Sequence, residues 1–225
     1  MSTAVKKKRK KQPQLSVETV SRRPQQNRSQ ASLERMLAAA RELMLERGED
    51  FTLQEVSRTG DVSIGSIYLR FESKDNLVRA VIANTLEEIA RDEEAMLDAV
   101  RAGATSLATL MPAYVDAYAE VLRGNAPLLR LARERAATDS LVAEPGKRSA
   151  MRSAAAGAAA MLDYRGEFGG DDHETKATSA YHVIFATLAR QLSLGSPSES
   201  TQSYDWELLK RELGRMCLAY LKSDN

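Results

Sequence analysis

Hydrophobic residues recur at intervals of three and four positions along most of the chain, which is the spacing of one face of an α-helix. The first stripe follows Ser32 and contains Leu33, Met36, Leu37, Ala40, Leu43 and Met44. Gly48 follows this stripe, at a place where a residue with left-handed backbone angles commonly ends a helix. The pattern predicts an amphipathic helix from Ser32 to just before Gly48.

Two short helices are predicted next, and each has a polar residue that can cap its start. Thr52 and Glu55 have the spacing of a capping box, in which each side chain bonds a free backbone N–H of the other residue. Ser63 can cap the second helix after a turn of about three residues, and Phe51 and Val62 can act as hydrophobic staples. The arrangement indicates a helix-turn-helix within a small helical bundle.

The rest of the chain also has the helical period. A fourth helix is expected from Ser73, and a long stripe around 107–122 contains Pro112, which should kink it. Pro127 suits the first turn of another helix. Further helices are expected at about 147–164, 174–194 and 204–222, with a loop at 195–203. No strand-like alternation occurs, so the predicted fold class is all-α.

Composition places the chain among globular proteins of the reducing cytoplasm. Hydrophobic residues make up 43% and charged residues 28%, and no apolar run approaches the roughly 20 residues that cross a bilayer. No apolar segment follows the basic N-terminal run, so we expect no signal peptide. Cys217 is the single cysteine, which excludes an intramolecular disulfide. We expect a cytoplasmic protein.

The net charge of +1 conceals a basic N-terminus. Residues 1–30 carry nine Lys or Arg and one acidic residue, Glu18, so this segment has a charge of +8 and the rest of the chain −7. Residues 1–29 lack apolar periodicity, which predicts a disordered basic arm with a polyanion as partner. The run KKKRKK is also compatible with a solvated tail or an import-like signal.

The second short helix, residues 64–71, has a nearly bare outer face. At 100° per residue, Ile67 and Phe71 point together toward a core, and Gly65 and Leu69 point away. A surface glycine in a helix costs about 1 kcal/mol relative to alanine, which close approach of a partner can offset. The DNA major groove admits such a helix. The alternative is that Gly65 is simply tolerated at the surface.

Nine residues around this helix are candidates for DNA contacts: Thr52, Ser63, Ile64, Gly65, Ser66, Tyr68, Leu69, Arg70 and Lys74. Ile64 and Leu69 can contact thymine methyl groups, and Arg70 can reach guanine or a phosphate. Tyr68 can bond a phosphate, as can Lys74 from a first turn whose free N–H groups favour an anion. Taken alone, Lys74 fits a solvated lysine better than a DNA contact.

The segment FTLQEVSRTGDVSIGSIYLRFESKDNL resembles the DNA-binding segment of the TetR family of bacterial regulators. The family pattern is a Thr-led helix, then Ala-Gly-Val-Ser-x-Gly-Thr-Leu/Ile-Tyr-x-His-Phe, then a Lys; the match covers about residues 32–82. Asp61 replaces a usual glycine, but aspartate tolerates left-handed angles, so the turn should survive. Arg70 replaces a common histidine and adds a charge that can alter which operator is read.

The resemblance implies three parts: the arm at 1–29, a helix-turn-helix domain at 30–84 with the motif at about 52–71, and a helical effector-binding and dimerisation domain at 85–225. It implies a homodimeric, nucleoid-associated repressor that binds a near-palindromic operator in double-stranded DNA and is released by a small molecule. The Met and Tyr residues of the candidate pocket favour an apolar or amphipathic molecule. A ligand-independent regulator or an activator is the alternative. No cofactor, metal or membrane partner is expected.

Candidate residues in the body follow from the same resemblance. Residues that could line an effector pocket are Met111, Tyr114, Tyr118 and Leu122, together with the alanines at 154–156 and 158–160. The alanines could instead allow close helix packing. Residues that could form a four-helix dimer interface are Tyr181, Phe185, Leu188, Trp206, Leu213, Met216 and Tyr220. These could also be intramolecular core.

An enzyme is not indicated by any motif in the chain. There is no glycine-rich phosphate loop, nucleophile elbow or cluster of metal ligands. His173 lies in an acidic loop without a metal-binding spacing, and His182 is expected to be structural. Cys217 could be a redox sensor, although a buried inert cysteine is the commoner case.

Overall fold

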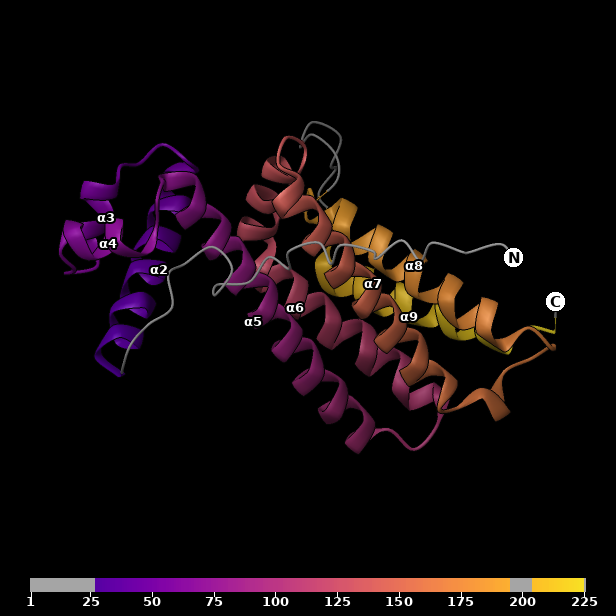
Figure 1. The fold of residues 1–225 in the computed structure, drawn as a ribbon. Coiled ribbons are helices and arrows are strands. Elements are labelled where there is room, and N and C mark those ends of the chain that lie inside the picture. Colours follow the sequence, from indigo (N-terminus) through magenta and orange to yellow (C-terminus); the bar gives the residue numbers. More distant parts are fainter. Residues whose placement is uncertain (1–26, 195–203, 225) are drawn as a thin grey trace, which may run out of the picture.

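The computed structural model of the protein describes residues 27–194 and 204–224, and every regular element in them is helical (Figure 1). The elements are α2 (Asn27–Arg47), α3 (Leu53–Thr59), α4 (Ile64–Arg70), α5 (Lys74–Gly103), α6 (Leu107–Ala136), α7 (Ser140–Leu162), the 3-10 helix η1 (Arg165–Glu167), α8 (His173–Gln191) and α9 (Trp206–Lys222). The all-α fold class is confirmed.

A small N-terminal domain lies at one end of the molecule and a larger helical body at the other (Figure 1). Helices α2, α3 and α4 and the first turns of α5 form the small domain, and α5 continues without interruption into the body. The domain boundary predicted near residue 84 therefore falls within a continuous helix. This helix connects the two parts mechanically.

The short helices start where their capping residues predict. The Thr52 hydroxyl accepts a hydrogen bond from the backbone N–H of Glu55 at 3.2 Å, and the Glu55 carboxylate accepts one from the N–H of Thr52 at 2.7 Å. The Ser63 hydroxyl at α4 and the Ser73 hydroxyl at α5 also accept a hydrogen bond from a backbone N–H three residues ahead, without the reciprocal bond of the capping box. Asp61 has a φ of 46°, so it adopts the left-handed conformation expected at this turn position, where the family pattern has glycine.

Two hydrophobic cores correspond to the two parts of the molecule. The first joins α2 to α5, with Met36, Ile67 and Phe71 fully buried. The second lies among α5 to α9 and contains Tyr114 and Tyr118. Val142 of α7 belongs to the first core, so the beginning of α7 is packed against the small domain.

Some predicted boundaries are wrong. Helix α2 begins at Asn27, five residues before the expected start at Ser32, so the end of the predicted arm is helical. Pro127 lies inside α6 instead of starting a new helix, because α6 continues to Ala136. Residues 1–26 of the predicted arm and the predicted loop at 195–203 lie outside the described residues.

Candidate nucleic-acid interface and body cavity

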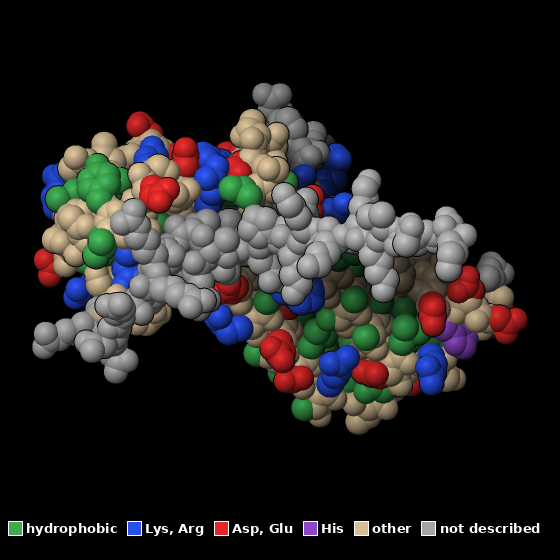
Figure 2. Space-filling model, in the orientation of Figure 1, with side chains coloured by type: hydrophobic (Ala, Val, Ile, Leu, Met, Phe, Trp, Pro, Cys, Tyr) green, Lys and Arg blue, Asp and Glu red, His purple; other side chains and the backbone are tan. Residues whose placement is uncertain are grey.

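Helix α4 presents an open surface on the side away from the core. Ile67 and Phe71 are fully buried, whereas Tyr68 and Leu69 are 51% and 65% exposed. No atom lies within 4 Å of the position that a Cβ would take at Gly65. Figure 2 shows hydrophobic side chains at the surface over α3 and α4. The bare, partly apolar face predicted for this helix is therefore present and accessible.

The hydroxyl groups at the start of α4 bond to each other. The Ser63 hydroxyl accepts a hydrogen bond from the backbone N–H of Ser66 at 3.1 Å, and the two hydroxyl oxygens lie 2.7 Å apart. Ile64, between these serines, is half-buried. Both hydroxyls lie beside the open face at Gly65, so they are near enough to a docked partner to exchange this bond for another.

Thr52 is exposed at the start of α3, but its hydroxyl is already engaged. It donates to the Glu55 carboxylate at 2.9 Å, and Arg47 donates to the other carboxylate oxygen at 3.0 Å. The hydrogen bond from the Thr52 backbone N–H, with those from Arg47 and the Thr52 hydroxyl, lowers the pKa of Glu55 to about 2. A phosphate at Thr52 would therefore lie beside a carboxylate that is charged at neutral pH.

Arg70 does not face outward as its position on the helical wheel predicts. It is only 7% exposed, and its Nη2 donates to both the carbonyl and the hydroxyl oxygen of Ser29 on α2. Its Nη1 is buried without a hydrogen-bond partner among the described residues, and burial lowers the pKa of the guanidinium. In this conformation Arg70 ties α4 to the start of α2 and does not present its charge to DNA.

Lys74 is also directed inward. Its Nζ donates to the backbone carbonyl of Glu49 and lies 4.8 Å from the centre of the Phe51 ring. The side chain therefore stabilises the connection between α2 and α3. The first turn of α5 remains a place where backbone N–H groups favour an anion.

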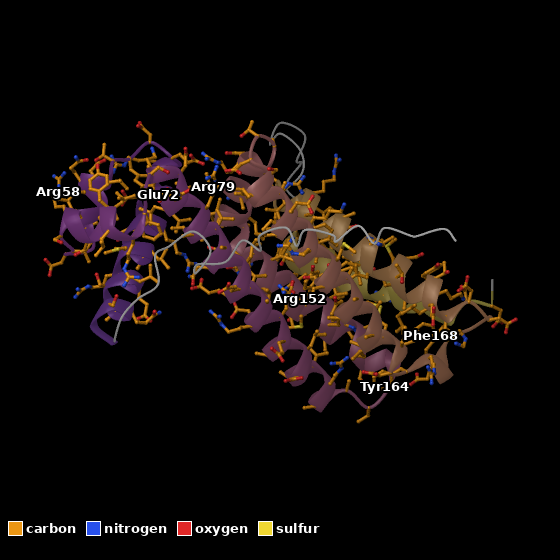
Figure 3. All side chains as sticks on the ribbon, viewed as in Figure 1. Arg58, Glu72, Arg79, Arg152, Tyr164 and Phe168 are labelled. Carbon is orange, nitrogen blue, oxygen red and sulfur yellow. The ribbon has the colours of Figure 1, made fainter. Side chains whose placement is uncertain are left out.

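Arg58 is a candidate contact that the helical pattern did not single out. It is exposed on the last turn of α3 and points outward at the far end of the small domain (Figure 3). An arginine on the first helix of a helix-turn-helix can bond a backbone phosphate. Its place in VSRTG, directly before the turn, was the available signal.

Residues 36–81, from within α2 into α5, match the model of the bacterial regulatory proteins of the tetR family. This segment of the chain is therefore a DNA-binding domain of the TetR type. The match covers the helix-turn-helix whose caps and open face are described above. The proteins that this model describes are bacterial regulatory proteins.

The fold of the chain is shared by solved structures at low sequence identity. A TetR-family transcriptional regulator from Mesorhizobium loti has a TM-score of 0.67 at 18% identity, covering 87% of this chain and 96% of the other. A transcriptional regulator from Cytophaga hutchinsonii has a TM-score of 0.64 at 19% identity, covering 86% and 100%. The fatty acid degradation regulator FadR from Bacillus halodurans has a TM-score of 0.59 at 15% identity, covering 82% and 97%. No curated protein matches by sequence.

The body of the molecule contains a cavity of about 500 Å³ between α5, α6, α7 and α8. Two predicted lining residues, Tyr118 and Leu122, do line it, but Met111 and Tyr114 do not. Tyr114 is stacked on Tyr118 from behind, with ring centres 5.6 Å apart. Gly157 leaves the space that Tyr114 and Tyr181 occupy, so α7 approaches these rings closely.

The predicted alanines of α7 do not line the cavity, and two of them pack in the core. Ala158 and Ala160 are buried in the core of the body, and none of the alanines at 154–156 or 158–160 lines the cavity. The alternative of close helix packing therefore holds for Ala158 and Ala160. The wall contributed by α7 comes from earlier positions on the helix, among them Ala143, Ala150 and Ser153.

One end of the cavity is polar and buried. Glu93 of α5 is 7% exposed, and the Ser153 hydroxyl lies 2.6 Å from each of its carboxylate oxygens. The hydroxyls of Tyr118 and Tyr181 lie 2.9 Å apart. Burial raises the pKa of Glu93, and the hydrogen bond from Ser153 opposes this only in part. Glu93 lies four positions after Ile89, so its place on an apolar stripe was a signal that sequence reasoning missed.

Most of the predicted dimer-interface residues lie in or beside the chain's own core. Tyr181, Leu188 and Leu213 are buried there, so the intramolecular alternative holds for them. Phe185 is half-buried and lines the cavity. Trp206 is half-buried and donates a hydrogen bond from Nε1 to the Glu120 carboxylate at 2.9 Å.

Two of the predicted interface residues remain at the surface of the last helix. Met216 is 65% exposed and Tyr220 is 41% exposed. Val183 of α8, which the sequence did not single out, is 50% exposed. These residues give the last two helices an exposed apolar component.

A network of ion pairs connects the small domain to the body. Arg135, near the end of α6, lies 2.8 Å from Glu49, 2.8 Å from Asp75 and 3.1 Å from Asp139. Arg79, which Figure 3 places where the two parts meet, lies 2.7 Å from Asp139. One arginine therefore holds together the loop before α3, the start of α5 and the start of α7.

The remaining candidate side chains lie outside these sites. Burial raises the pKa of the Cys217 thiol to about 11, so the thiolate is scarce at neutral pH. His173 bonds the carbonyl of Gly170 at 2.8 Å, and the described residues contain no group of three or more His, Cys, Asp or Glu able to hold a metal. A helix long and apolar enough to cross a membrane is likewise not found in the described ranges.

Proposed function

We propose that the protein is a dimeric, sequence-specific transcriptional repressor that a small apolar or amphipathic effector releases from its operator. The observation that carries this proposal is the continuity of α5. Its first turn follows the open helix α4 by three residues, and Ile82, Leu86, Ile89 and Glu93 further along it line the cavity. A molecule in the cavity therefore contacts the helix on which the candidate DNA-binding surface is mounted.

A homodimer fits the exposed apolar side chains on the last two helices. Burying Met216, Tyr220 and Val183 between two copies would remove them from water. In a dimer, two copies of α4 separated by one turn of DNA, about 34–36 Å, would fit successive major grooves of a near-palindrome. The exposed face of α4 would supply base contacts and Arg58 a phosphate contact.

Release would follow from a shift between two arrangements of α5, α6 and α7. An effector shifts this equilibrium only as far as its affinity differs between the two arrangements. The Arg135 network ties the end of α6 to Glu49 and Asp75. A change in separation between α5 and α6 would therefore alter the position of the small domain.

The proposal is tested with DNA from the promoter beside the gene. The purified protein should bind that fragment as a dimer with an affinity that falls as salt rises, and it should lower transcript yield in a purified transcription assay. A raised yield would instead support the activator alternative. Failure to bind any promoter fragment more tightly than unrelated DNA would refute the proposal.

The effector step has its own test and matched control. Ala132 lines the cavity, whereas Ala155 is an exposed alanine of α7 that does not. In a cellular reporter, Ala132→Phe should repress normally but lose the response to inducing compounds, because the added ring occupies part of the cavity that a ligand would need. Ala155→Phe should respond as the wild type does. Induction that is unaffected by Ala132→Phe would place the effector elsewhere.

A further inference from the structure

The cavity is long, with different chemistry along its length. From Ile82 to Glu93, both of which line it, α5 rises roughly 16 Å at about 1.5 Å per residue. Val142 and Ser153 of α7 line the cavity over the same interval. The part near Ile82 and Val142 is lined mostly by apolar side chains, and the part near Glu93 and Ser153 contains the acid and the tyrosine hydroxyls. The shape and polarity match a molecule with an apolar body and one polar head.

The polar end favours a positive head group. Within the described part of the chain, Glu93 forms no ion pair, and one hydroxyl, that of Ser153, bonds its carboxylate. A buried carboxylate that lacks a cation is costly, and a cation from outside would offset that cost. Arg152, on the adjoining part of α7, acts on Glu93 through its charge, but its side chain is exposed (Figure 3).

Aromatic rings next to Glu93 suit the same kind of head group. Tyr118 and Tyr181 have ring centres 5.9 Å apart, and Phe185 is stacked on Tyr181 at 6.2 Å. All three line the cavity. The faces of such rings attract cations, and their edges give an apolar wall.

Basic residues also line the cavity, but they are exposed. Arg133 and Lys147 are both at the surface, where water and salt weaken their interactions. Glu93 is buried, where the same charge interacts more strongly. The acid therefore decides the preferred charge of the ligand's buried head.

We propose that the cavity takes a cationic amphiphile, with its positively charged nitrogen against Glu93, Ser153 and the two tyrosine hydroxyls and its apolar body extending toward Ile82 and Val142. This inference deepens the proposed function, because it names the class of effector, and it rests on that function only where release from DNA is concerned. The fit itself depends on the cavity alone.

The test uses three probes with the same decyl chain and different heads: decylamine, protonated at pH 7, decanoate and decanol. Binding to the purified full-length protein is measured without DNA by titration calorimetry, below the concentrations at which the probes form micelles. We expect decylamine to bind most tightly. Glu93→Gln should lower the affinity for decylamine by about thirtyfold or more, because removing one member of a buried charge pair leaves the other charge unpaired. It should leave the affinity for decanol unchanged.

Glu94→Gln is the matched control, because Glu94 is the exposed neighbour on the same helix and should not affect any probe. The proposal would be overturned if decanoate or decanol bound most tightly, or if no probe bound at all. It would also be overturned if Glu93→Gln left decylamine binding unchanged, or if both variants lost decylamine affinity equally. Release of promoter DNA is measured separately. Decylamine that binds through Glu93 without releasing DNA would leave this inference standing and refute the effector function.

Discussion

Replacing Gly65 with glutamate should strengthen the fold. Gly65 is the second residue of α4, and no atom lies within 4 Å of the position of an added Cβ. Glycine is about 0.8–1.0 kcal/mol less favourable than alanine inside a helix, and an acidic residue in the first turn gains about 0.3–1 kcal/mol from the helix dipole. We expect the free energy of unfolding to rise by about 1 kcal/mol, which raises the melting temperature by about 2–4 °C for a chain of this size.

The same substitution should abolish specific DNA binding. The new carboxylate would stand on the open face of α4, where it would obstruct the groove and face the phosphates. Juxtaposed like charges at an interface cost several kcal/mol, so we expect at least about a hundredfold loss of affinity. Fluorescence anisotropy with a labelled promoter fragment, at one fixed salt concentration, measures this loss, and circular dichroism melting measures the stability.

Gly124→Glu is the matched control, because Gly124 is an exposed glycine of α6 with equally open surroundings. It should leave DNA affinity unchanged. If Gly65→Glu keeps wild-type affinity for the promoter fragment, α4 is not the recognition helix. If it lowers the melting temperature by several degrees, the open surroundings of Gly65 have been misjudged and the DNA result cannot be attributed to the interface.

Three further predictions concern other parts of the molecule. Arg70→Ala should lower the free energy of unfolding by about 1–2 kcal/mol through lost hydrogen bonds, without changing the operator sequence selected from random DNA; a changed sequence would mean that Arg70 swings out to read bases. Met216→Asp should give monomers in size-exclusion chromatography with light scattering. Met151 of α7 is similarly exposed, and Met151→Asp should leave the dimer intact. If Met216→Asp remains dimeric, the interface lies elsewhere. Glu93→Gln should raise the melting temperature at pH 7 but not near pH 4. Burial raises the folded pKa of Glu93 above its ordinary 4.5, so the wild type loses stability as pH rises from 4.5 through the folded pKa. An equal effect at both pH values would contradict this reasoning.

Helix starts could be predicted from the sequence because their causes are local. Thr52, Ser63 and Ser73 each bond a backbone N–H three residues ahead, so the signal and the structure occupy the same short window. The start of α2 was missed because its first turns lack the hydrophobic stripe from which that helix was predicted. One contact of these turns is long-range, because Arg70, 41 positions away, donates a hydrogen bond to Ser29.

Whether a side chain is buried or exposed could be predicted only where its position on its own helix determines the outcome. The helical wheel placed Ile67 and Phe71 in the core correctly, because they lie at the centre of the stripe. It placed Arg70 at the outer flank, and that prediction was wrong because α2 extends far enough to cover it. A stripe likewise cannot tell a dimer interface from an internal core, as Tyr181 shows.

The position of Glu93 bears on how the two sites are coupled. Glu93 lies roughly 27 Å along α5 from Asp75, at about 1.5 Å per residue, and Asp75 is held by Arg135 of α6. A ligand that binds better when α5 stands farther from α7 must therefore also bias the small domain at the other end of the same helix. By linkage, operator DNA must lower the protein's affinity for that ligand by the same factor by which the ligand lowers its affinity for DNA. We therefore expect an amphiphile that releases the promoter fragment to bind the protein–DNA complex less tightly than the free protein, by the same ratio.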